Sequence, residues 1–126
     1  MASLLASVAD ILLIDDDFTI RALLSLVLGA AGHTVREAQD GDEGVKQYHA
    51  KQPDIVITDL VMPTKGGLEV IAEIRRSKPA AKIIGMSGAT YLPSYLKMVE
   101  LLGESRVISK PFTPVRIVSA VADIMA

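Results

Sequence analysis

Five side chains that could take part in chemistry stand at or just beyond the ends of apolar, strand-like stretches of this sequence. Three are carboxylates, one is a hydroxyl and one is an ammonium group. In an open parallel sheet the carboxyl ends of the strands form one binding edge, so these groups would converge there. The five residues are Asp15, Asp16, Asp59, Ser87 and Lys110.

The types of these side chains point to phosphoryl chemistry with a metal ion. Three carboxylates in one small site repel each other, so at least one pKa is expected to rise unless a counter-charge is present. Few carboxylates combined with water and a substrate phosphate are typical of Mg²⁺. Histidine and thiolate metal sites are not indicated, because His33 and His49 lie elsewhere and the chain has no cysteine. Lys110 would supply a positive charge and Ser87 a hydroxyl for the phosphate oxygens. We therefore expect Asp59 to be a nucleophile that accepts a phosphoryl group.

Strands and helices are expected to alternate along the chain and to position these residues. Short apolar runs rich in β-branched residues predict buried strands, and apolar residues at helical spacing predict helices. Gly32 is expected just beyond the first helix, Gly66 as the N-cap of the third and Thr113 as the N-cap of the last. We expect strands over residues 10–17 (ending in its carboxylates), 34–38 (an edge strand), 55–59, 82–87 and 107–109, and helices over residues 19–31, 41–50, 67–77, 93–102 and from 113 to about 124.

Five strand–helix units predict a single α/β domain, built on a doubly wound five-stranded parallel sheet with helices on both faces. The chain has 126 residues, too few for an eight-unit barrel of ~250 residues. Half of the residues are apolar, which is ample for one core. Residues 1–9 are mostly small and apolar and are interpreted as an N-terminal extension, which leaves residues 10–126 as the domain.

The overall composition indicates a cytoplasmic protein. The net charge of −2 offers no basic footprint for direct nucleic-acid binding. The absence of cysteine fits a reducing compartment. No apolar run reaches the ~18 residues of a membrane span, and the first residues lack the basic start of a signal peptide. We therefore expect neither nucleic acid nor a membrane among the direct partners.

The motifs of the chain, taken together and in order, resemble those of the receiver domain of two-component response regulators, a chemotaxis-regulator-like family. The resemblance covers about residue 10 to the C-terminus, and it implies a flavodoxin-like fold with the strand order 2-1-3-4-5. The motifs that carry it are Leu13-Ile14-Asp15-Asp16-Asp17, Asp59 followed by Met62-Pro63, Gly67-Leu68-Glu69, Met86-Ser87-Gly88 and Lys110-Pro111-Phe112.

The family resemblance implies a role for each site residue. Asp59 would be the phosphoacceptor. The side chains of Asp16 and Asp59 and the backbone carbonyl of Val61 would ligate Mg²⁺, with Asp15 helping, often through water. The phosphoryl group would contact Ser87, which would shift when that group arrives, and also Lys110. The Lys110–Pro111 peptide bond is typically cis in this family.

The resemblance also implies how such a domain works. The phosphoryl donor would be a sensor histidine kinase or a histidine phosphotransferase, and phosphorylation would switch the binding of an output partner or domain that the sequence does not identify. The chain would not be an enzyme beyond self-catalysed phosphotransfer and slow autodephosphorylation. The surface over residues 93–107 would be the docking face and a candidate homodimer contact.

Three apolar residues depart from the family pattern. Val107 stands where the family usually carries Phe or Tyr, so an aromatic side chain that moves in step with Ser87 is missing there; Tyr91 or Tyr95 could substitute for it. Val61 and Ala89 replace polar or acidic residues that in relatives can orient the hydrolytic water. We therefore expect a long-lived aspartyl phosphate.

Two other functions are weighed against this one. The segment 15–19 fits the Asp-x-Asp-x-Thr motif of a small Mg²⁺-dependent haloacid-dehalogenase-type phosphatase, in which Asp15 would be the nucleophile and Asp17 the acid or base. Against it, the chain has no cap insertion and no late pair of acids at a strand end. A flavin-binding domain would need Ser, Thr or Gly after the first strand, where three aspartates would instead repel a phosphate.

Overall fold

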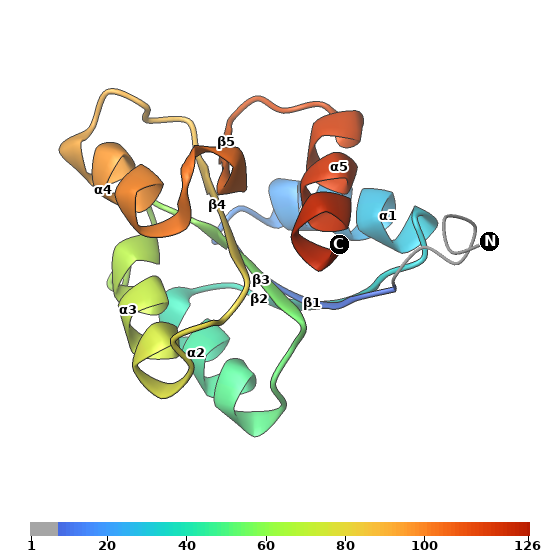
Figure 1. Cartoon of the computed structure of the whole chain (residues 1–126), viewed down its shortest axis with the longest axis horizontal. Helices are drawn as coiled ribbons and strands as arrows, with labels where there is room; N and C mark the ends of the chain where they lie inside the picture. Colours follow the sequence, from blue (N-terminus) through green and yellow to red (C-terminus); the bar gives the residue numbers. More distant parts are fainter. Residues whose placement is uncertain (1–7) are drawn as a thin grey trace.

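The computed structural model describes residues 8–126, so residues 1–7 of the expected N-terminal extension lie outside the described residues. Strands and helices alternate along the described chain (Figure 1). None of these helices is long and apolar enough to cross a membrane. The strands are β1 (Asp10–Ile14), β2 (Thr34–Ala38), β3 (Ile55–Asp59), β4 (Ile83–Ser87) and β5 (Val107–Ser109), and the helices are α1 (Phe18–Ala30), α2 (Gly41–Ala50), α3 (Gly67–Ser77), α4 (Pro93–Leu102), the short 3₁₀ helix η2 (Glu104–Arg106) and α5 (Pro114–Met125).

The five strands form one sheet in the order β2-β1-β3-β4-β5, and every neighbouring pair is parallel. In the register of the sheet, Ile11 of β1 lies opposite Val35 on one side and Ile55 on the other. The order 2-1-3-4-5 that the family resemblance implied is confirmed, and β2 is an edge strand as predicted. The chain reverses its direction of winding between β1 and β3, and open α/β sheets bind their ligands at the carboxyl ends of strands at such a point.

Each face of the sheet is covered by its own helices, and each face has its own core. Alternate residues of a strand point to opposite faces: Ile11 and Leu13 pack with α1 and α5, whereas Leu12 and Ile14 pack with α2, α3 and α4. Figure 1 shows the two groups of helices on opposite sides of the sheet. All four of these strand side chains are fully buried, and burial of each contributes roughly 1.5–3 kcal/mol. Because the strands are apolar on both faces, the sheet can pack against a layer of helices on each side.

The ends of the elements differ from the predicted bounds by a few residues at most. The first strand ends at Ile14 and not at Asp17, because the Asp15 Oδ1 accepts a hydrogen bond from the Asp17 N–H at 2.9 Å and bends the chain. Asp17 is instead the N-cap of α1. Three predicted caps are confirmed: Gly32 beyond α1 with a φ of 98°, Gly66 before α3 and Thr113 before α5.

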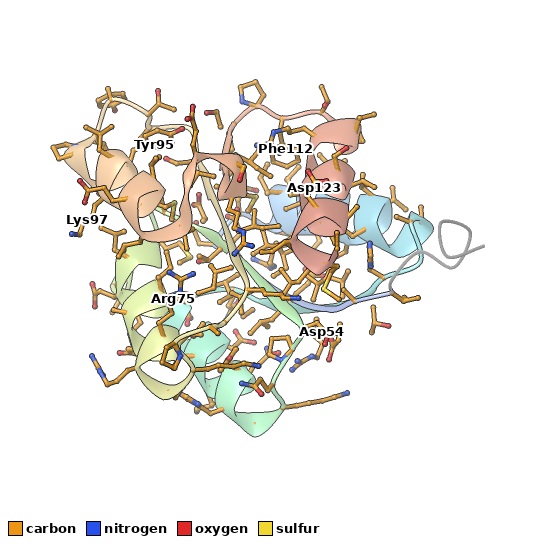
Figure 2. The ribbon with its side chains drawn as sticks, viewed as in Figure 1. Asp54, Arg75, Tyr95, Lys97, Phe112 and Asp123 are labelled. Carbon is orange, nitrogen blue, oxygen red and sulfur yellow. The ribbon has the colours of Figure 1, made fainter. Side chains whose placement is uncertain are left out.

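Helix α4 is fastened to α3 by one arginine. The Arg75 Nη1 donates a hydrogen bond of 2.7 Å to the carbonyl oxygen of Leu101 near the end of α4, where carbonyls lack helical partners. Figure 2 shows Arg75 on α3 and the outward-facing Lys97 on α4. In the surface that was expected to dock partners, Leu96 is exposed but Val107 is buried.

Candidate functional site

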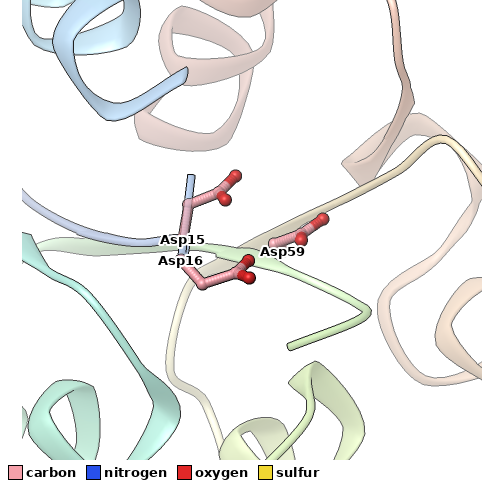
Figure 3. A group of neighbouring side chains, drawn as sticks. All are labelled: Asp15, Asp16 and Asp59. Carbon is pink, nitrogen blue, oxygen red and sulfur yellow. The ribbon is translucent and has the colours of Figure 1, made fainter. Parts of the chain in front are cut away.

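Three aspartates meet at the carboxyl ends of β1 and β3, as the sequence predicted. One carboxylate oxygen from each of Asp15, Asp16 and Asp59 lies within 4.8 Å of the others. Figure 3 shows the carboxylates of Asp15 and Asp16 extending to the side on which Asp59 stands. Asp15 is fully buried and Asp59 is only 7% exposed, whereas Asp16 is exposed. Successive residues at the end of β1 thus place one carboxylate in the protein and the next at its surface.

Lys110 connects the two buried carboxylates. Its Nζ lies 3.0 Å from the Asp15 Oδ2 and 3.1 Å from the Asp59 Oδ1. Burial by itself would lower the pKa of Lys110, but the hydrogen bond to Asp15 and the charge of Asp59 outweigh it and raise that pKa. The Lys110–Pro111 peptide bond is cis, as expected from the resemblance. Lys110 therefore stays charged and holds the acidic cluster together.

The pKa of Asp59 is raised from 3.8 to about 6. The largest cause is desolvation by burial, which the charge of Lys110 opposes and the charge of Asp15 reinforces. A rise in the pKa of one carboxyl was expected from the repulsion among the three carboxylates, and the rise is present. Repulsion is nevertheless the lesser cause, because Asp59 lies at the buried end of β3, where a carboxylate loses water.

Ser87 reaches the site from the end of the neighbouring strand β4. It is 1% exposed, and its Oγ accepts a hydrogen bond of 3.0 Å from the Ala89 N–H. The Lys110 N–H donates to the Ser87 carbonyl oxygen at 2.9 Å, so β5 brings the two residues together. The hydroxyl of Ser87 therefore stabilises the turn after β4 in the described arrangement.

Arg21 supports the site, although sequence reasoning gave it no role. Its Nη1 donates a hydrogen bond of 2.7 Å to the carbonyl oxygen of Asp15, and its Nε lies 3.1 Å from the Glu37 Oε1. A cation near the start of a helix that follows two aspartates is a signal that could have found it. Arg21 fixes the backbone of the turn that presents Asp15 and Asp16.

The donor atoms at the site fit a hard divalent cation. All three side chains offer carboxylate oxygens, the ligand type that Mg²⁺ prefers. Three carboxylates against the single ammonium of Lys110 leave a formal charge of −2 when all are ionised. The exposed position of Asp16 leaves room for the water molecules that Mg²⁺ usually retains. A divalent cation would thus neutralise the charge that Lys110 leaves unbalanced.

The residues that depart from the family pattern differ in their exposure to solvent. Val61 follows Asp59 by two residues and its side chain is 54% exposed. Val107 is buried, whereas Tyr91 is 83% exposed. The hydroxyl of Tyr95 on α4 lies 3.4 Å from the Ser109 Oγ, next to Lys110. Of the two tyrosines that could substitute for an aromatic at position 107, only Tyr95 contacts β5 in the described structure.

The geometry does not favour Asp15 as a nucleophile. Asp15 is fully buried, and its two carboxylate oxygens are held by the Asp17 N–H and by Lys110. Asp17 accepts hydrogen bonds from the first turn of α1, so it serves as a helix cap. These contacts leave neither residue in the role that a haloacid-dehalogenase-type phosphatase would require.

Comparison with known proteins agrees with the observed fold. The chemotaxis protein CheY of Thermotoga maritima is 36% identical over 111 residues, which cover 87% of this chain and 92% of that protein. The transcriptional regulator NtrC of Azospirillum brasilense is 36% identical over 115 residues, but the match spans only 24% of its length. The solved structure of the chemotaxis protein CheY4 of Vibrio cholerae has a TM-score of 0.83 at 26% identity and covers 94% of this chain and 99% of that chain.

The family model described as the response regulator receiver domain matches residues 11–122. This match covers the five strands, except the first residue of β1, and most of α5. Receiver domains are signalling domains, not enzymes in the ordinary sense, and the strand order agrees with the chemotaxis regulators above. The chain therefore belongs to the response regulator receiver domain family of two-component signalling.

Proposed function

We propose that this chain takes a phosphoryl group from a phosphohistidine onto Asp59 and that this modification switches its binding to a partner. The donor would be a sensor histidine kinase or a histidine phosphotransferase in the cytoplasm. One observation carries the proposal: an acid of 7% exposure stands 3.1 Å from the ammonium of Lys110 and close to two further carboxylates. This arrangement places a carboxylate nucleophile among fixed charges that can hold a phosphoryl group.

The transfer itself requires little from the protein beyond position and charge. A carboxylate oxygen of Asp59 forms a bond to phosphorus while the phosphorus–nitrogen bond of the donor breaks, and the electron pair of that bond stays on the imidazole nitrogen. With a pKa of about 6, Asp59 is ionised at pH 7 and yet more basic than an ordinary aspartate. Lys110 would then contact an oxygen of the transferred group.

The acidic cluster would hold Mg²⁺ through the side chains of Asp15, Asp16 and Asp59 and through the backbone carbonyl of Val61. When bound, the ion would supply neutralisation of the charge on the phosphoryl oxygens. Asp15 already contacts Lys110, so it would act mainly by keeping the ammonium group in place. Asp16, which is exposed, would be the carboxylate that is open to an arriving ion.

Ser87 and the segment after it would transmit the change. The phosphoryl group carries ~1.5–2 negative charges in place of the single charge of the Asp59 carboxylate. The Ser87 hydroxyl, which accepts a hydrogen bond of 3.0 Å from the Ala89 N–H, would give up this bond and donate one to a phosphoryl oxygen. The segment 87–92 would then shift together with α4. The exposed side of α4, with Leu96, would present the result to an output partner or to a second copy of the chain.

Chemical phosphorylation with a small phosphoramidate donor and Mg²⁺ tests this proposal. We expect intact-mass measurement to find one added phosphoryl group on the native chain and on the control Asp123→Asn, but none on Asp59→Asn. Asp123 is a suitable control because it is an exposed acid on α5. Peptide mapping then assigns the modified residue. Label on Asp15 would support the phosphatase alternative, and a native chain that takes no label would overturn the proposal.

The phosphorylated chain is expected to be long-lived, because no polar side chain stands at Val61 or Ala89 to orient the hydrolytic water. We expect decay with Mg²⁺ present to take many minutes, measured as the loss of phosphoprotein after removal of the donor. Val61→Asn, which places an amide two residues after Asp59, is expected to decay faster. Complete decay of the native phosphoprotein within seconds would contradict this prediction.

A further inference from the structure

The loop between β3 and α3, residues 60–66, contains an unfavourable backbone conformation. Among the described residues, Thr64 is the single non-glycine residue with a positive φ, at 67°. A β-branched side chain is a poor fit to this left-handed region. The Lys65 N–H donates to the Pro63 carbonyl oxygen at 2.7 Å, which closes a tight three-residue turn around Thr64. Such a conformation is unfavourable and persists only where its surroundings impose it.

The next residue, Lys65, supplies the contacts that impose this turn. Its Nζ lies 2.7 and 2.8 Å from the two carboxylate oxygens of Glu73 on α3, and 3.1 Å from the Asp42 Oδ1 on α2. The side chain is only 17% exposed. The carbonyl oxygen and the stem of Lys65 also occupy the space where a Cβ on Gly41, the first residue of α2, would lie. Two helices thus clamp one loop through a single lysine.

We propose that Lys65 is a positioning residue that sets the affinity of the acidic cluster for Mg²⁺. This inference rests on the proposed function, because the clamped loop carries the Val61 carbonyl. The loop starts directly after Asp59, and the Gly67 N–H closes it with a hydrogen bond of 2.8 Å to the Leu60 carbonyl oxygen. Relaxation of the turn at Thr64 would therefore turn the backbone that presents the Val61 carbonyl oxygen.

The direction in which the Mg²⁺ affinity changes when Lys65 is removed distinguishes a positioning role from a purely electrostatic one. Lys65 carries a positive charge in the loop that follows Asp59. Its removal would by Coulomb's law strengthen the attraction of the site for a divalent cation. Loss of the clamp would instead weaken binding, because the Val61 carbonyl would no longer be held toward the site. The two explanations predict opposite changes in the dissociation constant.

Calorimetric titration of the metal-free protein with MgCl₂ tests this inference. We expect Lys65→Met to weaken Mg²⁺ binding roughly 10-fold, at the low end of the loss seen when a group that orients a metal ligand is removed. Methionine keeps the packing of the stem against Gly41. We expect Lys65→Arg to bind Mg²⁺ nearly as the native chain does. Lys97→Met is the matched control, because this substitution changes the net charge by the same amount. Lys97 forms only an exposed ion pair of 3.5 Å with Glu100 on α4.

Amide hydrogen exchange of the metal-free protein gives a second readout. We expect faster exchange of the Gly67 amide in Lys65→Met than in Lys97→Met, since this amide closes the clamped loop. Should Lys65→Met fail to fold, Lys65→Gln, which removes the same charge but keeps an amide that can donate a hydrogen bond to Glu73, is expected to weaken Mg²⁺ binding to a smaller degree. Unchanged or tighter Mg²⁺ binding by the folded variants would overturn the inference alone. Absence of Mg²⁺ binding by the native chain would overturn the proposed metal site and the inference with it.

Discussion

Burial of Asp59 raises the pKa of this residue and has a cost in stability. A carboxyl whose pKa is raised from 3.8 to about 6 by desolvation binds its proton more tightly in the folded chain than in the unfolded chain. Its contribution to stability is therefore fully present below pH 3.8 and is lost as the pH rises through about 6. Lys110 limits the loss because it attracts the ionised form. At neutral pH the metal-free protein thus contains a buried Asp59 in its ionised form, which burial disfavours.

Replacement of Asp59 by asparagine is expected to remove this pH dependence. In EDTA, the free energy of unfolding of the native chain should fall relative to that of Asp59→Asn by about 1 kcal/mol between pH 5 and pH 7.5. Urea unfolding at several pH values measures the difference. The control Asp123→Asn removes a charge from an exposed site and should show a constant offset. A difference between native and Asp59→Asn that does not change with pH would contradict the assigned cause.

At the scale of the elements, the junctions between strands and helices hold the site. Helix α3 begins at Gly67, and a Cβ on this residue would collide with the backbone of Asp59 and Leu60. The backbone of β3 cannot move aside without displacing Asp59 itself. Glycine at this position therefore lets α3 start directly against the strand that carries the proposed phosphoacceptor.

Two glycine-to-alanine substitutions are expected to have opposite effects on stability. Gly67→Ala should lower the free energy of unfolding by about 2 kcal/mol, as expected for a clash that rigid neighbours cannot relieve. Gly29→Ala in α1 should raise it by about 0.5 kcal/mol, because alanine favours the helix and no atom lies within 4 Å of the added Cβ. Urea unfolding of both variants measures the contrast. An equal change in the two variants would contradict the packing described here.

The elements themselves could be predicted because their signals are local. Helices α2, α3 and α4 have the predicted bounds, since glycine or proline residues stand at or near their ends. The first strand was predicted too long, because three aspartates in sequence do not reveal that the first one bends the chain. The burial of Asp15 beside the exposed Asp16 likewise depends on the turn that follows β1.

At the scale of the whole molecule, the site joins residues that are far apart in the chain. The ion pair between Lys110 and Asp15 links positions 95 residues apart. This convergence could be predicted because the carboxyl ends of all strands in a parallel sheet lie at one edge. The clamp of Lys65 by Asp42 and Glu73 was not predicted, since charged residues in a loop and on helix surfaces have the pattern of a solvated face. Ion pairs between a loop and two helices leave no periodic pattern in the sequence.

Binding of Mg²⁺ is expected to stabilise the entire fold, because the acidic cluster exists only when β1 and β3 are paired. At a free concentration ten times the dissociation constant, the gain is about 1.4 kcal/mol, which corresponds to roughly 5 °C in the unfolding temperature. Thermal unfolding in MgCl₂, compared with NaCl of equal ionic strength, measures it. Asp59→Asn should reduce the gain, whereas Asp123→Asn should retain it. Equal unfolding temperatures in millimolar MgCl₂ and in matched NaCl would contradict the proposed metal site, since a ligand of the folded state alone must shift the equilibrium toward that state.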